Sequence, residues 1–256
     1  MIIAGIYGLI GGAALFIGAL FGIYVKNIPK GLVGVIMAFG SGVLISALTF
    51  NLMEKAYQSG GLNSVSIGFI SGALLFVGGD YLIDSCGGYF RKIWHGERYI
   101  AKKGTVNNSK QVNSGFAIFL GAILDGIPES AAIGIGLAAG KGIGLSMLVA
   151  VFLSNLPEGI SGALGMKKSG KSNIYIMTVW CITIAICSGA AMLGYSILGD
   201  ASPDIIAITL ALAAGAILAM IADTMMPEAF EEGGRFVALV TATGFLLTFI
   251  VSHMAK

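Results

Sequence analysis

Charge is scarce in this chain of 256 residues. Asp, Glu, Lys and Arg make up only 11% of it, against about 25% in ordinary soluble domains. Hydrophobic residues make up 56%, and the mean hydropathy is strongly positive. This composition excludes a soluble globular domain, and we expect no nucleic-acid partner. It predicts an all-α integral membrane protein that is surrounded by the lipid bilayer.

Cysteine and histidine are scarce as well. The three cysteines, Cys86, Cys181 and Cys187, form no CxxC pattern, so the sequence indicates neither a disulfide framework nor a thiolate metal site. The two histidines, His95 and His253, lie in a loop and at the C-terminal tail. A metalloprotease needs an HExxH motif and a serine enzyme needs a base. We therefore expect neither an enzyme nor a resident cofactor.

Long charge-free runs are what the chain has instead. About 20 apolar residues cross the hydrocarbon core as a helix; six runs qualify outright and two more are interrupted only by carboxylates. We expect a single domain of eight membrane-spanning helices, the first of which is retained because it lacks the basic start of a signal peptide. The predicted helices cover about residues 2–25, 31–54, 62–84, 112–138, 142–166, 172–199, 204–228 and 236–254 of the domain 1–256.

Lysine and arginine gather on one side of these predicted helices. Twelve of the fifteen basic residues fall on one set of connections, whereas Lys55, Lys141 and Lys256 fall on the other. Short cytoplasmic loops carry the excess of basic residues. We therefore expect the long loop 85–111 in the cytoplasm and both termini outside the cell.

The second predicted helix resembles the seventh. With an offset of 173 residues, Gly42 falls on Gly215, and the pair at 60–61 falls on the pair at 233–234, all of them glycines. The charge pattern makes the two helices run in opposite directions, so the repeat is inverted, as in many transporters whose site lies at the bilayer midplane. We expect a 3+2+3 arrangement: three helices, a central pair and three more.

Two similar polar phrases, LDGIPES and LSNLPEG, interrupt the central pair. Asp125 and Glu129 in the first phrase, and Ser154 and Glu158 in the second, are four residues apart and share a helix face. Ionisable groups at this depth are costly and usually face a cavity or pathway. No Lys or Arg lies near the middle of any predicted span. The carboxylates are therefore either protonated or bind a cation that comes and goes.

Pro128 and Pro157 stand within the same two phrases. A proline cannot donate to the carbonyl four residues earlier and breaks or bends the helix, and a freed carbonyl is tolerated in a membrane where it lines a cavity. Oxygen ligands suit Mg, Ca and Mn, so the phrases predict a divalent-cation pathway. The predicted metal ligands are Asp125, Glu129, Ser154, Asn155 and Glu158.

Three further residues, Asn51, Asp223 and Glu228, are candidates for the pathway or its exit. The two acids fall at the cytoplasmic end of the seventh predicted helix, where they are placed to pass metal to the cytosol. A proton or monovalent-cation pathway is the alternative, because membrane carboxylates also relay protons. The sequence leaves open which metal is carried, whether protons are coupled to it, whether transport is channel-like, and whether the chain forms a homodimer.

The two phrases resemble the fourth-helix and fifth-helix signatures of the ZIP (Zrt-, Irt-like) metal transporters. Those signatures typically read HNxPEG and, in the fifth helix, His or Gln, then Glu, Asn or Asp, then xPEG. Residues 214–229, which begin with Ala-Gly and end with MMPEA, are similar to the seventh helix of the GufA-type bacterial branch. The resemblance implies eight helices and uptake of Zn, Fe, Mn or a similar metal across the cell membrane of a bacterium. It also implies that Glu129 and Glu158 bind metal.

The sequence departs from that family at four places. Asp125 stands where the fourth-helix histidine usually is, and Ser154 stands where the fifth helix has His or Gln. A second metal site in some members uses an Asn and a Glu, at places taken here by Gly126 and Ser188. These departures imply one metal site rather than two, and a preference moved from Zn toward Mn or Fe.

Overall fold

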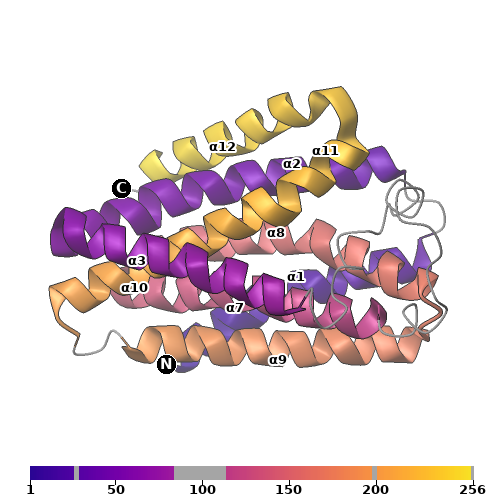
Figure 1. Ribbon diagram of the computed structural model, residues 1–256, viewed down its shortest axis with the longest axis horizontal. Coiled ribbons are helices and arrows are strands. Elements are labelled where there is room, and N and C mark those ends of the chain that lie inside the picture. Colours follow the sequence, from indigo (N-terminus) through magenta and orange to yellow (C-terminus); the bar gives the residue numbers. More distant parts are fainter. Residues whose placement is uncertain (26–28, 84–113, 198–200, 255–256) are drawn as a thin grey trace.

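The computed structural model describes residues 1–25, 29–83, 114–197 and 201–254, and every regular element in these ranges is a helix (Figure 1). The predicted loop 85–111 lies outside the described residues. Six helical stretches in these ranges are long and apolar enough to cross a membrane, which identifies a multi-pass membrane protein. They are Ile2–Tyr24, Gly31–Ile83, Ile118–Ala139, Gly142–Lys167, Asn173–Ile197 and Pro203–Ile250.

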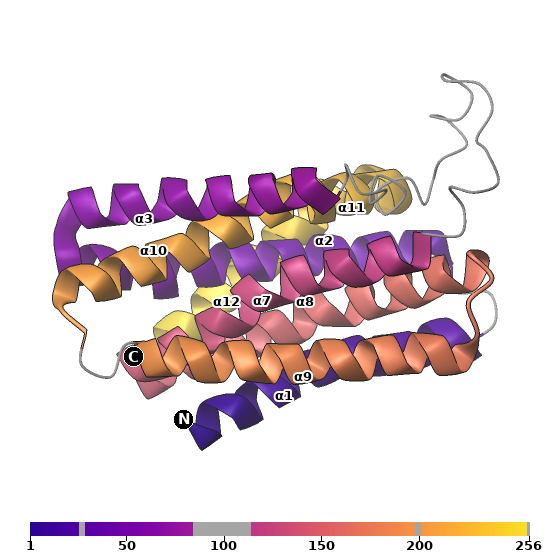
Figure 2. The same ribbon diagram turned by 60° about the horizontal axis from the view of Figure 1, so that its bottom comes forward.

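The helices lie side by side along one long axis (Figures 1 and 2). The α-helices are α1 (Ile2–Tyr24), α2 (Lys30–Ala47), α3 (Glu54–Ile83), α7 (Ser114–Ala139), α8 (Lys141–Lys168), α9 (Asn173–Ile197), α10 (Pro203–Met220), α11 (Met226–Gly233) and α12 (Val237–Met254). Two π-helical segments, η1 (Leu48–Met53) and η3 (Ile221–Met225), and one 3₁₀ turn, η4 (Gly234–Phe236), connect some of them.

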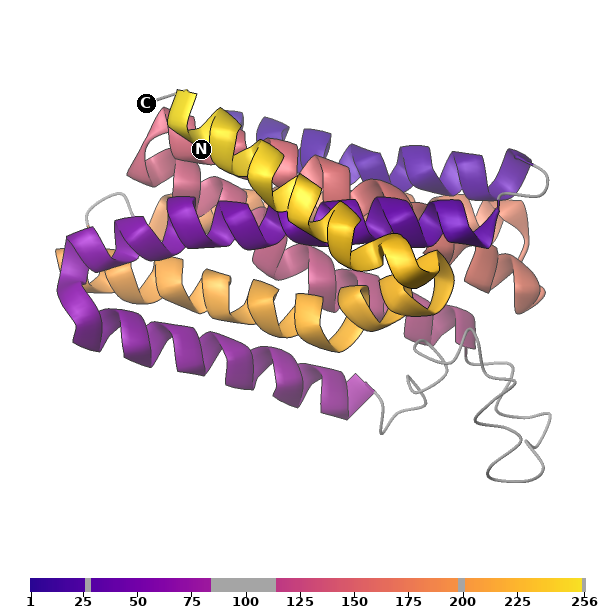
Figure 3. The same cartoon turned by 90° about the horizontal axis from the view of Figure 1, so that it is seen from above.

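Two glycines reverse the chain inside the longest helical stretches. Gly61 has φ 70° and Gly234 has φ 65°, a left-handed conformation that favours glycine because it has no Cβ. Figure 3 shows the chain turning back after η1 at one end of the bundle and after α11 at the opposite end. We call these ends the Gly61 end and the Gly234 end. The helices continue beyond the predicted ends at about 54 and 228, up to the glycine that permits the turn.

Capping residues fix where two helices begin. The Ser202 side chain accepts a bond from the Ile205 N–H at the start of α10, with Pro203 and Asp204 in the first turn. The Ser172 hydroxyl likewise accepts from the Tyr175 N–H, at 3.2 Å, beside the start of α9. Such caps satisfy N–H groups that have no partner within the helix.

Four helix pairs cross at glycines. The pairs α1 with α8, α7 with α9, α2 with α12, and α3 with α10 make the most extensive contacts in the fold. In each pair, one glycine on each helix lies so close that an added Cβ would meet a carbonyl of the other backbone. Small residues allow this approach, which stabilises helix packing where lipid removes the hydrophobic driving force. The facing glycines are Gly18 and Gly159, Gly134 and Gly194, Gly42 and Gly244, and Gly72 and Gly215.

These contacts divide the described helices into two groups. One group contains α1, α7, α8 and α9, and the other contains α2, α3, α10, α11 and α12. The groups meet chiefly where α2 packs on α8 and where α10 packs on α7. The largest hydrophobic core cluster runs through this boundary, with Leu44, Leu52 and Ile217 from one group and Ile133 and Met147 from the other.

The backbone repeats at the offset that the sequence predicts. The π-helical segments η1 and η3 begin 173 residues apart, and so do the two positive-φ glycines that follow them. Gly42 and Gly215, each of which faces a glycine of another helix, are also separated by this offset. In Figure 3, α2 runs toward the Gly61 end and α10 runs away from it. The two segments are therefore equivalent in local structure and opposite in direction.

Candidate functional site

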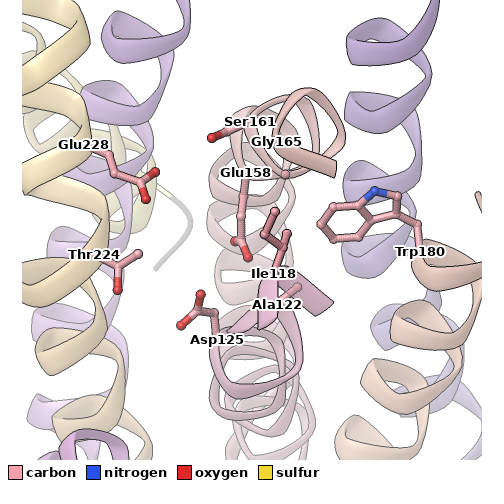
Figure 4. A pocket seen from close by; sticks show the side chains of 10 residues that line it. Ile118, Ala122, Asp125, Glu158, Ser161, Gly165, Trp180, Thr224 and Glu228 are labelled. Carbon is pink, nitrogen blue, oxygen red and sulfur yellow. The ribbon is translucent and has the colours of Figure 1, made fainter. Parts of the chain in front are cut away.

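A small pocket with both apolar and acidic residues in its lining opens where the two helix groups meet (Figure 4). It has a volume of about 60 Å³, which is room for a few water molecules. Its walls come from α7, α8, α9, η3 and α11, so both helix groups contribute. The lining residues are Ile118, Ala122, Asp125, Glu158, Ser161, Gly162, Gly165, Trp180, Thr224 and Glu228.

Three carboxylates line this pocket. Asp125 on α7 and Glu158 on α8 point toward one another, and Glu228 on α11 lies on the opposite side with Thr224 (Figure 4). Asp125 is only 4% exposed. Among the described residues that line the pocket there is no Lys or Arg, and carboxylates buried in this way favour a proton or a nearby cation. Carboxylate and hydroxyl oxygens are the ligands that hard divalent cations prefer.

Glu129 lies apart from the pocket lining, although it is one helical turn from Asp125. Its side chain is fully buried, and its Oε1 accepts a hydrogen bond from the Ser154 hydroxyl at 3.2 Å. Its Oε2 has no hydrogen-bond partner among the described residues. A buried carboxylate oxygen without a partner is costly. This oxygen is therefore the strongest candidate for a bond to something that enters the protein.

Asn155 ties the central pair to α1. Its side-chain Nδ2 donates to the Gly11 carbonyl at 3.0 Å, and its Oδ1 is buried without a hydrogen-bond partner in the described part of the chain. The amide is thereby oriented with its oxygen available as an acceptor. The Ser154 hydroxyl has one proton to donate, and two acceptors lie within reach of it, Glu129 Oε1 at 3.2 Å and the Val151 carbonyl at 3.0 Å.

The predicted ligand set is split in this structure. Across the described residues, no three His, Cys, Asp or Glu side chains are close enough together to hold a metal ion. Asp125 and Glu158 share the pocket with Glu228, while Glu129 and Asn155 are buried outside its lining. The ligand role of these residues therefore stays a prediction.

The remaining pathway candidates lie on the two π-helical segments. Asn51, on η1, is 6% exposed and lies outside the pocket lining. Asp223, on η3, is exposed and is also outside the lining. Of the three candidates, only Glu228 is brought into the pocket.

The two prolines do not break their helices. Pro128 lies inside α7 and Pro157 lies inside α8, and both helices continue beyond them. The role of each proline in freeing a carbonyl for the pathway stays a prediction. The flanking turns maintain the helix, and only the bond that each proline cannot donate is lost.

Among the pocket residues that the sequence reasoning missed are Ser161, Thr224 and Trp180. Helical spacing could have found two of them, because Ser161 follows Glu158 by three residues and Thr224 precedes Glu228 by four. Trp180 carried no such signal, since it lies in a charge-free helix. Its fully buried indole covers one side of the pocket.

Replacing Ser154 with Ala is expected to lower cation uptake about tenfold, because partners that orient a ligand contribute about 10- to 100-fold to metal affinity or activity. The change leaves both oxygens of Glu129 without a donor. Initial uptake rates into proteoliposomes measure the effect. Ser146→Ala is the matched control, since Ser146 lies on the same helix and bonds only the Gly142 carbonyl. Equal rates for the two variants would contradict this role.

Two comparisons with known proteins bear on this site. No family model matches the chain. The chain is similar to a protein of Arabidopsis thaliana that is provisionally described as a zinc transporter, with 24% identity over 226 residues. The matched region covers 86% of this chain and 33% of the plant protein, so the chain spans about a third of the length of that relative.

Proposed function

We propose that this protein carries a divalent metal cation across a membrane through the pocket between α7, α8 and α11. Similarity to a described zinc transporter supports metal-ion transport in general and a membrane transporter rather than an enzyme. The observation that carries the proposal is the acidic pocket. Asp125, Glu158 and Glu228 face one cavity inside a bundle of membrane-spanning helices.

The oxygen-rich lining supports Mn or Fe as the preferred cargo over Zn. The pocket and its neighbourhood offer carboxylates, hydroxyls and an amide, whereas zinc more often takes imidazole or thiolate ligands. Gly126 and Ser188 stand at the two positions where some ZIP transporters have the ligands of a second metal site, and neither provides a carboxylate or an amide side chain. The Gly126 carbonyl accepts from the Cys187 thiol, and Ser188 donates to the Gly5 carbonyl at 3.0 Å. We therefore propose one cation site.

The proposed membrane arrangement has eight spans, in the order three, two and three. Gly61 and Gly234 each divide one of the six apolar stretches into two spans, which gives eight spans in all. The distribution of Lys and Arg supports an orientation in which the Gly234 end is cytoplasmic and the Gly61 end is external. Glu228 lies on α11, next to the Gly234 end, so it lies on the exit side of the pocket.

Uptake into proteoliposomes tests the proposal. Wild-type protein is expected to accumulate Mn and Fe faster than Zn and Cd, and the double change Glu129→Ala with Glu158→Ala is expected to abolish accumulation. Protein-free vesicles and a fluorescence-detected size-exclusion profile of each variant are the controls. A folded protein that moves protons or monovalent cations but none of these four metals would replace the proposal with the alternative pathway.

A further inference from the structure

The segment from η1 to Gly61 has an equivalent in the segment from η3 to Gly234. Each segment begins with a π-helical turn and ends at a positive-φ glycine. The two starts are 173 residues apart, and so are the two ends. No insertion therefore lies between the two landmarks. Burial follows the same register, since Ala56 and its equivalent Ala229 are fully buried.

This register assigns an equivalent to each pocket residue on η3 and α11. Thr224 corresponds to Asn51, and the two side chains are 8% and 6% exposed. Glu228 corresponds to Lys55, and both are partly buried. A lysine thus takes the backbone position on one side of the fold that a pocket glutamate takes on the other.

An inverted repeat gives these equivalents a functional meaning. When the two halves of a transporter are related in this way, access from one side uses residues equivalent to those that give access from the other. In this structure Thr224 and Glu228 line the pocket next to the Gly234 end. The corresponding access from the Gly61 end passes Asn51 and Lys55.

The Asn51 side chain supports a second half-pathway independently. Its Nδ2 is buried and has no hydrogen-bond partner among the described residues. Buried amides are normally paired with protein groups or water. An unpaired amide N–H donor at the position equivalent to a pocket residue indicates that water reaches it in another conformation.

Two acids lie at the same end of the bundle as Lys55, namely Glu54 and Asp204, and Asp204 accepts a hydrogen bond from Ser64 at 2.9 Å. Glu54 is the adjacent acid, and its Oε1 accepts a bond from the Gln58 amide at 3.2 Å along the exposed face of α3. Successive residues point about 100° apart around a helix, so Glu54 and Lys55 lie on different faces. The helix that follows η1 therefore presents a positive charge where the helix that follows η3 presents a negative one.

We propose that Lys55 is a specificity-determining residue that opposes cation entry from the Gly61 end, while Glu228 favours cation binding at the Gly234 end. The inference rests on the proposed function for the identity of the cargo. Net direction of passive transport is set by the gradient, so the charge difference appears in the apparent affinity for cation on each side. A lysine about 8 Å from a divalent ion in a wet pathway changes its occupancy roughly fivefold.

Sided uptake measures this effect. The protein is oriented in vesicles so that the Gly61 end faces outward, and metal is added outside. Lys55→Gln is then expected to lower the KM for Mn roughly fivefold, and Lys55→Glu roughly 25-fold. The maximal rate changes little, because the cation site itself is intact. Lys141→Gln is the matched control, as the sequence places Lys141 on the same side. An unchanged KM in both Lys55 variants would overturn the proposal.

Thiol labelling tests the charge without any metal transport. Asn51→Cys is introduced after the three native cysteines are replaced, and external cationic and anionic methanethiosulfonates of equal size are compared. Adding Lys55→Gln is expected to raise the ratio of cationic to anionic labelling rates roughly fivefold. No labelling from that side, or a ratio that Lys55→Gln leaves unchanged, would overturn the proposal. If metal uptake fails while the ratio shifts, the proposed cargo is wrong and the half-pathway stands.

Discussion

Replacing Glu158 with Gln is expected to reduce metal uptake by about 100-fold while the protein remains folded. Glu158 faces Asp125 across the pocket and is the central carboxylate of its lining (Figure 4). Glu158 is partly buried, and losing a bond to a charged group costs about 1.5–3 kcal/mol, where every 1.4 kcal/mol is about tenfold in affinity. Gln keeps the size and one oxygen of Glu, so the loss reports charge and not packing. Initial rates of Mn uptake at several concentrations measure it.

Glu231→Gln is the matched control for this variant. Glu231 lies on α11 close to Glu228 in sequence, but its side chain is exposed and outside the pocket lining. The same charge is removed from the protein, so any effect of net charge on vesicle binding is shared. We expect uptake by this control within about twofold of wild type, since exposed charges contribute little. Equal losses in both variants would show that the pocket is not the pathway.

The helices and their repeat are largely predictable from the sequence. Apolar runs of about 20 residues determine where helices form in lipid, and the paired glycines at 60–61 and 233–234 give the offset that the backbone then displays. The π-helical segments are not predictable in this way. Leu48–Met53 and Ile221–Met225 each mix apolar residues with two polar ones, and nothing local in them distinguishes an i to i+5 bond from an i to i+4 bond.

The residues that line the pocket were predictable only in part. Helical spacing puts Asp125 and Glu129 on one face of α7, but it does not determine which of them reaches the cavity. That depends on how α7 is rotated against its neighbours, which the crossing of Gly134 with Gly194 fixes. Glu129 therefore meets Ser154 instead of the pocket. The place of Trp180 has the same origin, since α9 is held on α7 by this crossing.

The glycine crossings themselves lead to the largest expected effect on stability. Gly72→Ala is expected to destabilise the protein by about 3 kcal/mol or more, because the added Cβ meets the Leu212 carbonyl of α10, and overpacking of this kind costs about 1–3 kcal/mol when side chains alone must move. Here the obstacle is backbone, so the whole helix must shift. Thermal unfolding in detergent, followed by fluorescence-detected size exclusion, measures the loss.

The variant Gly78→Ala, on the same helix, separates the effect of the helix crossing on stability from the effect of helix propensity. A Cβ at Gly78 meets no atom within 4 Å, so this variant is expected to be neutral or stabilised by about 0.5–1 kcal/mol, as alanine favours helix over glycine. The two substitutions are chemically identical and differ only in what they approach. Because α3 and α10 support η1 and η3 respectively, a shift at Gly72 is also expected to displace Thr224 and Glu228 and to slow uptake. Gly78→Ala transports normally if the crossing, and not the helix alone, positions the pocket.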